Sequence, residues 1–158
     1  MHARPDQWQT ATEFVKKHLN PSQFEVESRL LAIAEAAGCA PKFTIAPPLT
    51  IRLELHERLT DWLTTARSGD KHGMAERLVQ TIKRLRAAGV CHRDVKVTDV
   101  VVDRGQPLLI DFELGTEVDP GGPCYDLVGP GGSGIPIPPV DHAIGFPMVL
   151  RRRNAAIN

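Results

Sequence analysis

A polar loop followed by a short hairpin is the sequence feature that most constrains how this chain folds. The loop covers residues 91–99, and two apolar runs follow it, Val100–Val102 and Leu108–Ile110, joined by a polar turn. Runs rich in valine and leucine with a glycine-containing turn between them predict a β-hairpin. Because a hairpin returns the chain to its starting point, Asp99 and Asp111 at its two ends are expected to be neighbours.

The residues gathered by this hairpin suit phosphoryl transfer. Transfer of a γ-phosphoryl group needs an acidic residue near the accepting hydroxyl, oxygen ligands for Mg²⁺ and a cation that offsets the charge on the transferred group. The loop carries Asp94, Lys96 and Asp99, and the far end of the hairpin delivers Asp111. All the required groups therefore occur within a short stretch.

The same residues resemble a known catalytic centre. His92-Arg93-Asp94 with Lys96 resembles the catalytic loop of eukaryotic-type serine/threonine protein kinases, and the Asp111-Phe112-Glu113 triplet resembles their DFG motif. The resemblance implies that Asp94 is the catalytic base, Lys96 contacts the γ-phosphate and Asp111 is the main Mg²⁺ ligand. The alternative, that the aspartates are only turn and cap residues, is disfavoured by their order and spacing.

Two positions depart from the protein-kinase pattern. Asp99 stands where the family has an asparagine as second metal ligand, so the resemblance implies a second metal ligand of higher charge. Glu113 replaces the glycine of DFG, which weakens the match to regulated protein kinases. A third family, the small-molecule kinases of the aminoglycoside phosphotransferase type, is disfavoured because it usually lacks equivalents of Arg93 and Lys96.

The resemblance extends toward the amino terminus and covers about residues 12–118. Lys16, on a short apolar strand, is the candidate for the phosphate-contacting lysine, and Glu27 on the following helix is the candidate for its partner, with Glu25 second. The alternative is that these are solvated charges. Leu55 and Glu57 fall where the hinge should bind adenine through its backbone, which makes them candidate ATP-binding residues.

Both ends of the family pattern are expected to be trimmed. The 15 residues before Lys16 contain no glycine, so the Gly-rich loop over the ATP phosphates is expected to be absent. Beyond Thr116, most of the usual carboxyl-terminal helices have no counterpart. We therefore predict a minimal, truncated two-lobed protein-kinase-like α+β fold in a single domain, residues 1–158. It divides into a small amino-terminal lobe (1–55), a catalytic core (56–118) and an activation-segment-like tail (119–158).

Local signals predict the main elements. Asn20-Pro21 is an N-cap and first-turn pair, and Gly38 is placed to end the helix that follows. Polar and apolar residues alternate over 50–55, which predicts a strand. A short helix is expected at 61–66, a break at 68–70 and a longer helix at 74–88.

The tail from Asp119 to Pro147 holds seven prolines and seven glycines, so it cannot be a regular helix or a central strand. Its apolar residues favour an ordered, irregular loop. Ser133 and Thr116 are interpreted as ordinary loop residues rather than phosphosites. The stretch 140–145 has only a vague likeness to the next family helix, and the basic run 151–153 is expected to be a solubilising tail.

Charge and cysteine content exclude other classes. The 19 basic and 19 acidic residues give no net charge, which argues against nucleic-acid or anionic-membrane binding. Cys39, Cys91 and Cys124 are widely spaced, so we expect reduced, buried thiols rather than a disulfide framework or zinc site. There is no apolar run of membrane-spanning length and no signal peptide, so a soluble, cytoplasmic protein is expected.

The sequence therefore predicts a phosphotransferase that uses ATP and Mg²⁺ and acts on a serine or threonine hydroxyl. The alternative is a pseudokinase, a regulatory module that keeps the fold and binds a protein partner with weak or no turnover. Both interpretations involve a protein, as substrate or as partner. A chain that lacks supporting helices also suggests a partner or a homo-oligomer that covers apolar surface.

Overall fold

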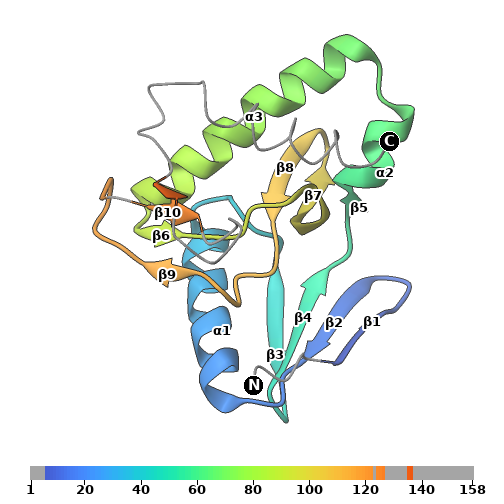
Figure 1. Ribbon diagram of the computed structural model, residues 1–158. Helices are drawn as coiled ribbons and strands as arrows, with labels where there is room; N and C mark the ends of the chain where they lie inside the picture. The colour runs from blue at the N-terminus through green and yellow to red at the C-terminus, as the bar shows by residue number, and fades with distance from the viewer. Residues whose placement is uncertain (1–5, 123, 127–134, 137–158) are drawn as a thin grey trace.

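The computed structural model describes residues 6–122, 124–126 and 135–136, and its fold is mixed α+β as predicted (Figure 1). It is compatible with a truncated kinase-like fold. The helices are α1 (Pro21–Ala36), α2 (Leu59–Thr65) and α3 (Ser68–Ala87), and a 3-10 turn, η1, covers Val97–Asp99. The strands are β1 (Asp6–Gln9), β2 (Glu13–Lys17), β3 (Phe43–Ala46), β4 (Thr50–Glu54), β5 (Glu57–Arg58), β6 (Val90–Cys91), β7 (Val100–Asp103), β8 (Gln106–Leu109), β9 (Thr116–Glu117), β10 (Tyr125–Asp126) and β11 (Ile135–Pro136).

The first four strands form one antiparallel sheet in the order β1-β2-β4-β3. The predicted alternation over 50–55 is confirmed, because Ile51 and Leu53 of β4 are buried while Arg52 and Glu54 are exposed. Strand β2 pairs with β4 so that Lys16 lies opposite Ile51. Helix α1 lies beside this sheet (Figure 1), and the end of β2 and the buried face of α1 together position the first part of the site.

Helix α1 begins and ends as its sequence predicts. The Asn20 side chain accepts a hydrogen bond from the Ser22 amide at 2.9 Å, Pro21 occupies the first turn, and Gly38 follows the helix with a φ of 67°. The cap and the left-handed glycine satisfy backbone groups that the helix ends leave unpaired. The helix buries Leu30, Leu31 and Ala34 in the core and also Glu27, a charged residue that needs a partner.

Helix α3 starts earlier than predicted, because the expected break at 68–70 is its first turn. The interruption lies at Ala66 and Arg67 instead, and the Lys71 amide donates to the Arg67 carbonyl at 3.1 Å. Asp70 in the first turn favours this start, since a negative charge there stabilises the positive end of the helix dipole. The predicted stop at Gly89 is confirmed by its φ of 84°.

The predicted hairpin is present as β7 and β8, joined by a tight turn in which Arg104 and Gly105 have φ of 47° and 78°. The Ile110 amide donates to the Asp99 carbonyl at 2.9 Å, so the two ends of the hairpin meet. The hairpin, α1, α3 and the four-stranded sheet share one core. Its members include Leu30, Leu31, Ile51, Leu53, Met74, Leu78, Leu85, Val100, Leu109 and Phe112.

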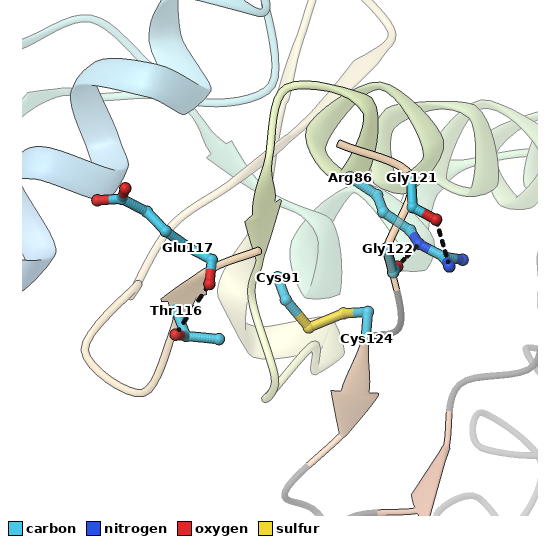
Figure 2. Close-up of a disulfide and its surroundings, with 7 residues drawn as sticks. All are labelled: Arg86, Cys91, Thr116, Glu117, Gly121, Gly122 and Cys124. Carbon is cyan, nitrogen blue, oxygen red and sulfur yellow. Dashed lines mark hydrogen bonds between the residues drawn. A yellow bond between two sulfur atoms is a disulfide. The ribbon is translucent and has the colours of Figure 1, made fainter. Parts of the chain in front are cut away.

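The prediction of reduced thiols is wrong for two of the three cysteines. Cys91 at the end of β6 forms a disulfide with Cys124, with their Cα atoms 5.6 Å apart (Figure 2). Arg86 of α3 donates hydrogen bonds to the carbonyls of Gly121 and Gly122, which holds the segment of Cys124 near β6. No local pattern predicts this approach, because 33 positions separate the two cysteines. Cys39 is a buried free thiol, as expected.

Part of the predicted tail lies outside the described residues, including Ser133, the stretch 140–145 and the basic run 151–153. Two short strands in the tail, β10 and β11, pair antiparallel. None of the helices within the described residues has both the length and the apolar character that a membrane span requires. The division at residues 55 and 118 stays a prediction.

Candidate active site

His92 connects the predicted catalytic loop to the triplet at 111–113. It is 3% exposed and its Nε2 lies 2.8 Å from the carbonyl oxygen of Ile110. Because the carbonyl can only accept, Nε2 is the donor. The ring also packs against Phe112, with ring centroids 4.7 Å apart. The loop and the triplet are therefore held at a fixed separation by a buried imidazole.

Two residues near this connection have strained backbones. Arg93 has a φ of 69° and Asp111 a φ of 65°, both in the left-handed region. Such conformations are uncommon outside glycine and persist where the surroundings enforce them, often at functional sites. The half-buried Arg93 side chain makes no hydrogen bond or ion pair within the described part of the chain. Arg93 thus lies in the predicted loop without joining the polar network.

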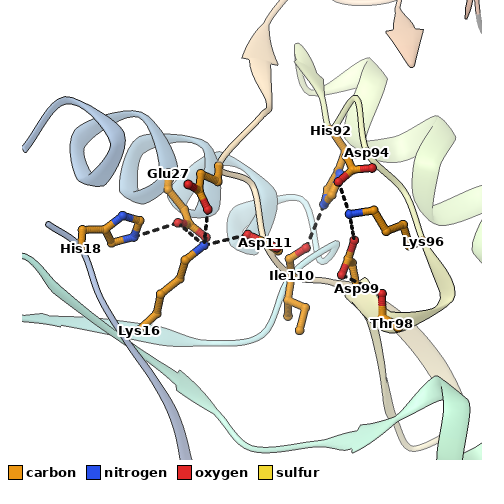
Figure 3. A network of polar contacts seen from close by, with 11 residues as sticks. Lys16, His18, Glu27, His92, Asp94, Lys96, Thr98, Asp99, Ile110 and Asp111 are labelled. Atoms are coloured by element: carbon orange, nitrogen blue, oxygen red, sulfur yellow. Dashed lines mark hydrogen bonds and ion pairs between the residues drawn. The ribbon is translucent and has the colours of Figure 1, made fainter. Parts of the chain in front are cut away.

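Asp94, Lys96 and Asp99 form one ionic group, which we call the Lys96 cluster (Figure 3). The Lys96 ammonium contacts Asp94 Oδ2 and lies 3.5 Å from Asp99 Oδ2. The Thr98 hydroxyl donates to Asp99 Oδ1 at 3.1 Å. The two carboxylates are nearly buried, whereas the Lys96 side chain is 30% exposed. The cluster therefore has one side open to a ligand.

The electrostatics of the Lys96 cluster favour a further cation. Burial raises the pKa of Asp99, and the nearby Asp111 carboxylate raises it further against the effect of Lys96. Burial opposes the charge on Lys96, but Asp94 and Asp99 outweigh it, so the pKa of Lys96 lies above its usual value. Asp94 Oδ1 and Asp99 Oδ2 are buried without a hydrogen-bond partner among the described residues. Carboxylate oxygens that make no hydrogen bond are ligands that Mg²⁺ prefers.

The second group, which we call the Lys16 cluster, consists of Lys16, His18, Glu27, Asp111 and Glu113. The Lys16 ammonium lies 2.8 Å from Glu27, 2.7 Å from Asp111 and 3.3 Å from Glu113. His18 Nε2 lies 2.8 Å from Glu27 Oε2. Burial opposes the charge of Lys16, but Glu27 and Asp111 outweigh it and raise its pKa above the usual value. Lys16 is therefore a permanent, buried cation.

Lys16 and Glu27, paired in the sequence analysis, are thus brought together, while the second candidate Glu25 is exposed on α1. Asp111 pairs with Lys16 and also acts electrostatically on Lys96 and Asp99. Asp111 therefore lies between the two clusters, as Figure 3 shows. A set of three carboxylates, Glu27, Asp111 and Glu113, has oxygens close enough to share one cation.

The hinge residues line a pocket of about 370 Å³. The pocket is lined by Gln9, Phe14, Leu53, Glu54, Leu55, His56, Glu57, Arg58, Asp61, Val101 and Ile110. The Leu55 amide donates to the Thr12 carbonyl at 3.0 Å, so this N–H is already used, and Glu57 pairs with Val102 in a small sheet. Leu55 and Glu57 thus border the pocket, but the Leu55 amide is not free for a base.

Sequence reasoning missed three residues of the site. His18 lies two positions after Lys16, just past the end of β2, and residues so spaced along an extended chain face the same side, which was the available signal. Phe14 lies two positions before Lys16 on the same face and lines the pocket. Glu113 was noted only as a departure from DFG, whereas its carboxylate contacts Lys16.

A comparison with known families supports a phosphotransferase. The model of the phosphotransferase enzyme family (APH) matches residues 22–129, from the first turn of α1 through the catalytic loop and the 111–113 triplet. Strand β2 with Lys16 precedes the matched range. No curated protein matches the chain at a significant level.

Proposed function

Because the chain belongs to the phosphotransferase enzyme family, within the protein kinase-like superfamily, we propose that it transfers the γ-phosphoryl group of ATP to a serine or threonine hydroxyl with Mg²⁺ as cofactor. The observation that carries the proposal is the position of Asp111 between two lysine clusters. One cluster offers a fixed buried cation, and the other offers carboxylate oxygens that make no hydrogen bond among the described residues. Phosphate groups and a divalent cation require this combination.

Each residue has a distinct role in the proposed reaction. Asp94 accepts the proton of the attacking hydroxyl, as the oxygen forms its bond to the γ-phosphorus and the bond to ADP breaks. Lys96 offsets charge on the transferred group, and Lys16 holds the phosphates. Asp99 and Asp111 would hold Mg²⁺, which neutralises charge on the phosphates when bound. His92 fixes the loop relative to Asp111, while no contact supports a direct role for Arg93.

The pocket beside the hinge would receive the adenine base. Phe14 from β2 and the apolar side chains of Val101 and Ile110 line it, and an aromatic ring stacks favourably on a purine. The carbonyls of residues 54–57 remain candidates for the polar contacts to adenine. ATP in this pocket would extend its phosphates toward Lys16 and Asp111.

The family match changes the weight given to the acceptor. The sequence analysis disfavoured small-molecule kinases of the aminoglycoside phosphotransferase type because of Arg93 and Lys96. With the match to the phosphotransferase enzyme family, these two residues are insufficient grounds for that conclusion. Support for a protein acceptor rests on the His92-Arg93-Asp94 and Lys96 pattern. A small-molecule hydroxyl is the competing acceptor, favoured by the family match.

The test is phosphoryl transfer from radiolabelled ATP. The purified chain is incubated with Mg²⁺ and either serine- and threonine-containing peptides or a panel of hydroxylated small molecules. We expect labelled peptide, and we expect Asp94→Asn to reduce its formation by about 10² to 10⁴, while Asp119→Asn at an exposed position leaves it unchanged. If only small molecules are labelled, the acceptor is a small-molecule hydroxyl rather than a protein. Absence of any transfer would refute the proposed phosphotransferase activity.

The second candidate is a nucleotide-binding pseudokinase. It is favoured by two contacts: Lys96 pairs with the proposed base Asp94, and Glu113 adds a carboxylate beside the phosphate-binding Lys16. Stabilisation by Mg²⁺-ATP in a melting experiment without any phosphoryl transfer would select this candidate. A protein partner, a homo-oligomer and a cytoplasmic location remain predictions. The Cys91–Cys124 disulfide argues against the last, because disulfides persist mainly in oxidising compartments.

A further inference from the structure

His18 is a buried polar residue that the proposed reaction does not use. It follows the last residue of β2, two positions after Lys16, and both side chains face Glu27 (Figure 3). The His18 and Glu27 side chains are both 0% exposed, and Nε2 of the first lies 2.8 Å from Oε2 of the second. The His18 imidazole and the Glu27 carboxylate are thus buried together next to Lys16.

Packing alone does not account for an imidazole at this position. Its ring meets Phe24 edge to face with centroids 5.9 Å apart, a contact that leucine or methionine would also make. Burial of a polar group costs free energy unless it is paired. Neither ring nitrogen of His18 makes a hydrogen bond among the described residues, so its 2.8 Å approach to Glu27 is an electrostatic contact rather than a hydrogen bond. The contact with Glu27 is the interaction that an apolar residue would lose.

Glu27 competes with two other carboxylates for the Lys16 ammonium. Its partner Lys16 is also attracted by Asp111 at 2.7 Å and Glu113 at 3.3 Å, both of which lie after the hairpin. Glu27 contacts Lys16 through both oxygens, at 3.0 Å and 2.8 Å. The Glu27 carboxylate must hold a lysine that two other carboxylates also attract. A second, fixed partner of Glu27 helps, because it restricts the rotamers that the Glu27 side chain can adopt.

We propose that His18 is a positioning residue that orients the Glu27 carboxylate, and thereby fixes the Lys16 ammonium where nucleotide phosphates bind. This inference rests on the proposed function for its catalytic consequence, but the geometric part concerns the Lys16 cluster itself. His18 touches neither nucleotide nor acceptor in this account. Its effect passes through Glu27 alone.

The first experiment compares His18→Leu with His18→Gln. Glutamine places a polar amide beside Glu27, whereas leucine keeps volume and removes the polar contact. We expect His18→Leu to raise the dissociation constant of Mg²⁺-ATP about tenfold, and His18→Gln to stay within about threefold of the native chain. If leucine fails to fold, His18→Met replaces it. Equal affinities for all variants, or equal losses for Gln and Leu, would overturn the proposal.

The second experiment tests whether the effect passes through Glu27. In a Glu27→Gln background, adding His18→Leu should reduce Mg²⁺-ATP affinity by less than about twofold, because its target is already changed. Full additivity of the two losses would contradict the proposed route. Unfolding by urea, measured for each variant, separates loss of fold from loss of orientation.

A third measurement does not depend on nucleotide binding. Proton exchange of the Lys16 ammonium, followed by ¹⁵N NMR, reports how firmly it is held. We expect exchange to be at least about fivefold faster in His18→Leu than in the native chain and restored in His18→Gln. If the native chain binds no nucleotide but this pattern is observed, the proposed function fails and the positioning role stands. Unchanged exchange in His18→Leu refutes the role.

Discussion

The two lysine clusters use similar residues but differ in how they are enclosed. The Lys16 side chain is 2% exposed and is ringed by Glu27, Asp111 and Glu113, whereas Lys96 is 30% exposed with Asp94 and Asp99. Removing one partner of a buried ion pair strongly lowers the free energy of unfolding, whereas removing one partner of an exposed pair lowers it little. The Lys16 cluster should therefore be part of the folded framework, and the Lys96 cluster a part that exchanges partners when a ligand arrives.

The largest expected effect comes from removing each lysine in turn. Lys16→Met leaves Glu27 as an uncompensated buried charge, so we expect a loss of about 3 to 5 kcal/mol in the free energy of unfolding. Lys96→Met should lose less, about 1 to 3 kcal/mol, because Lys96 itself is 30% exposed although Asp94 and Asp99 beside it are buried. Urea unfolding of both variants measures the difference. Equal losses would mean that the two clusters do not differ in this way.

Breaking the Cys91–Cys124 disulfide tests how the loop of the Lys96 cluster is held. Cys124→Ser should lower stability by about 3 to 4 kcal/mol, from the entropy of the loop that the bond closes. Urea unfolding with and without dithiothreitol measures this. The native chain should lose the same stability in dithiothreitol, and Cys124→Ser should be insensitive to it. A native chain unaffected by dithiothreitol would indicate that the bond contributes nothing.

Removing the charge of Glu113 should increase the affinity of the Lys16 cluster for Mg²⁺-ATP. Glu113→Gln removes a carboxylate 3.3 Å from Lys16, and we expect Mg²⁺-ATP to bind roughly tenfold more tightly because a repulsion of about 1.4 kcal/mol is lost. Calorimetric titration measures the affinity. Glu76→Gln, on the exposed face of α3, is the matched control and should change nothing. Weaker binding in Glu113→Gln would instead mark Glu113 as a cation ligand.

The smallest effect is expected at Asp99. Burial raises its pKa, so the ionised carboxylate destabilises the folded chain at neutral pH. This cost decreases as the pH falls through the raised pKa and is gone below the usual value of 3.8. Asp99→Asn should therefore add about 0.5 to 2 kcal/mol of stability at pH 7 while it weakens Mg²⁺ dependence. Urea unfolding at pH 7 gives the sign. A destabilised Asp99→Asn would show that its pairing with Lys96 outweighs burial.

The sequence predicted those features that short-range chemistry determines. The Asn20 cap, the Gly38 stop and the hairpin at 100–109 follow from local residue preferences, and the hairpin brings Asp99 and Asp111 together. The pairing of Lys16 with Glu27 depended on a family resemblance, because separate elements carry them.

Features that depend on tertiary packing were not predicted. The disulfide requires Cys124 to lie beside β6, and the His18 contact requires the side of α1 that faces β2. Glu113 lies 3.3 Å from Lys16, which belongs to a strand far away in the sequence. The contacts of Cys124 and Glu113 have no local sequence signal, whereas the position of His18 two residues after Lys16 was one. The start of α3 was predicted too late, because Ser68, Gly69 and Asp70 are residue types common in turns but form the first turn of the helix.

Thermal melting of the native chain and of Asp111→Asn with increasing Mg²⁺-ATP tests most directly that the site between the two clusters binds nucleotide phosphates and metal. Binding to the folded state adds about 2.7 kcal/mol of stability at a hundred times the dissociation constant. We predict a concentration-dependent rise in the melting temperature of the native chain and no rise for Asp111→Asn. No rise in the native chain, or the same rise in both, would contradict the account.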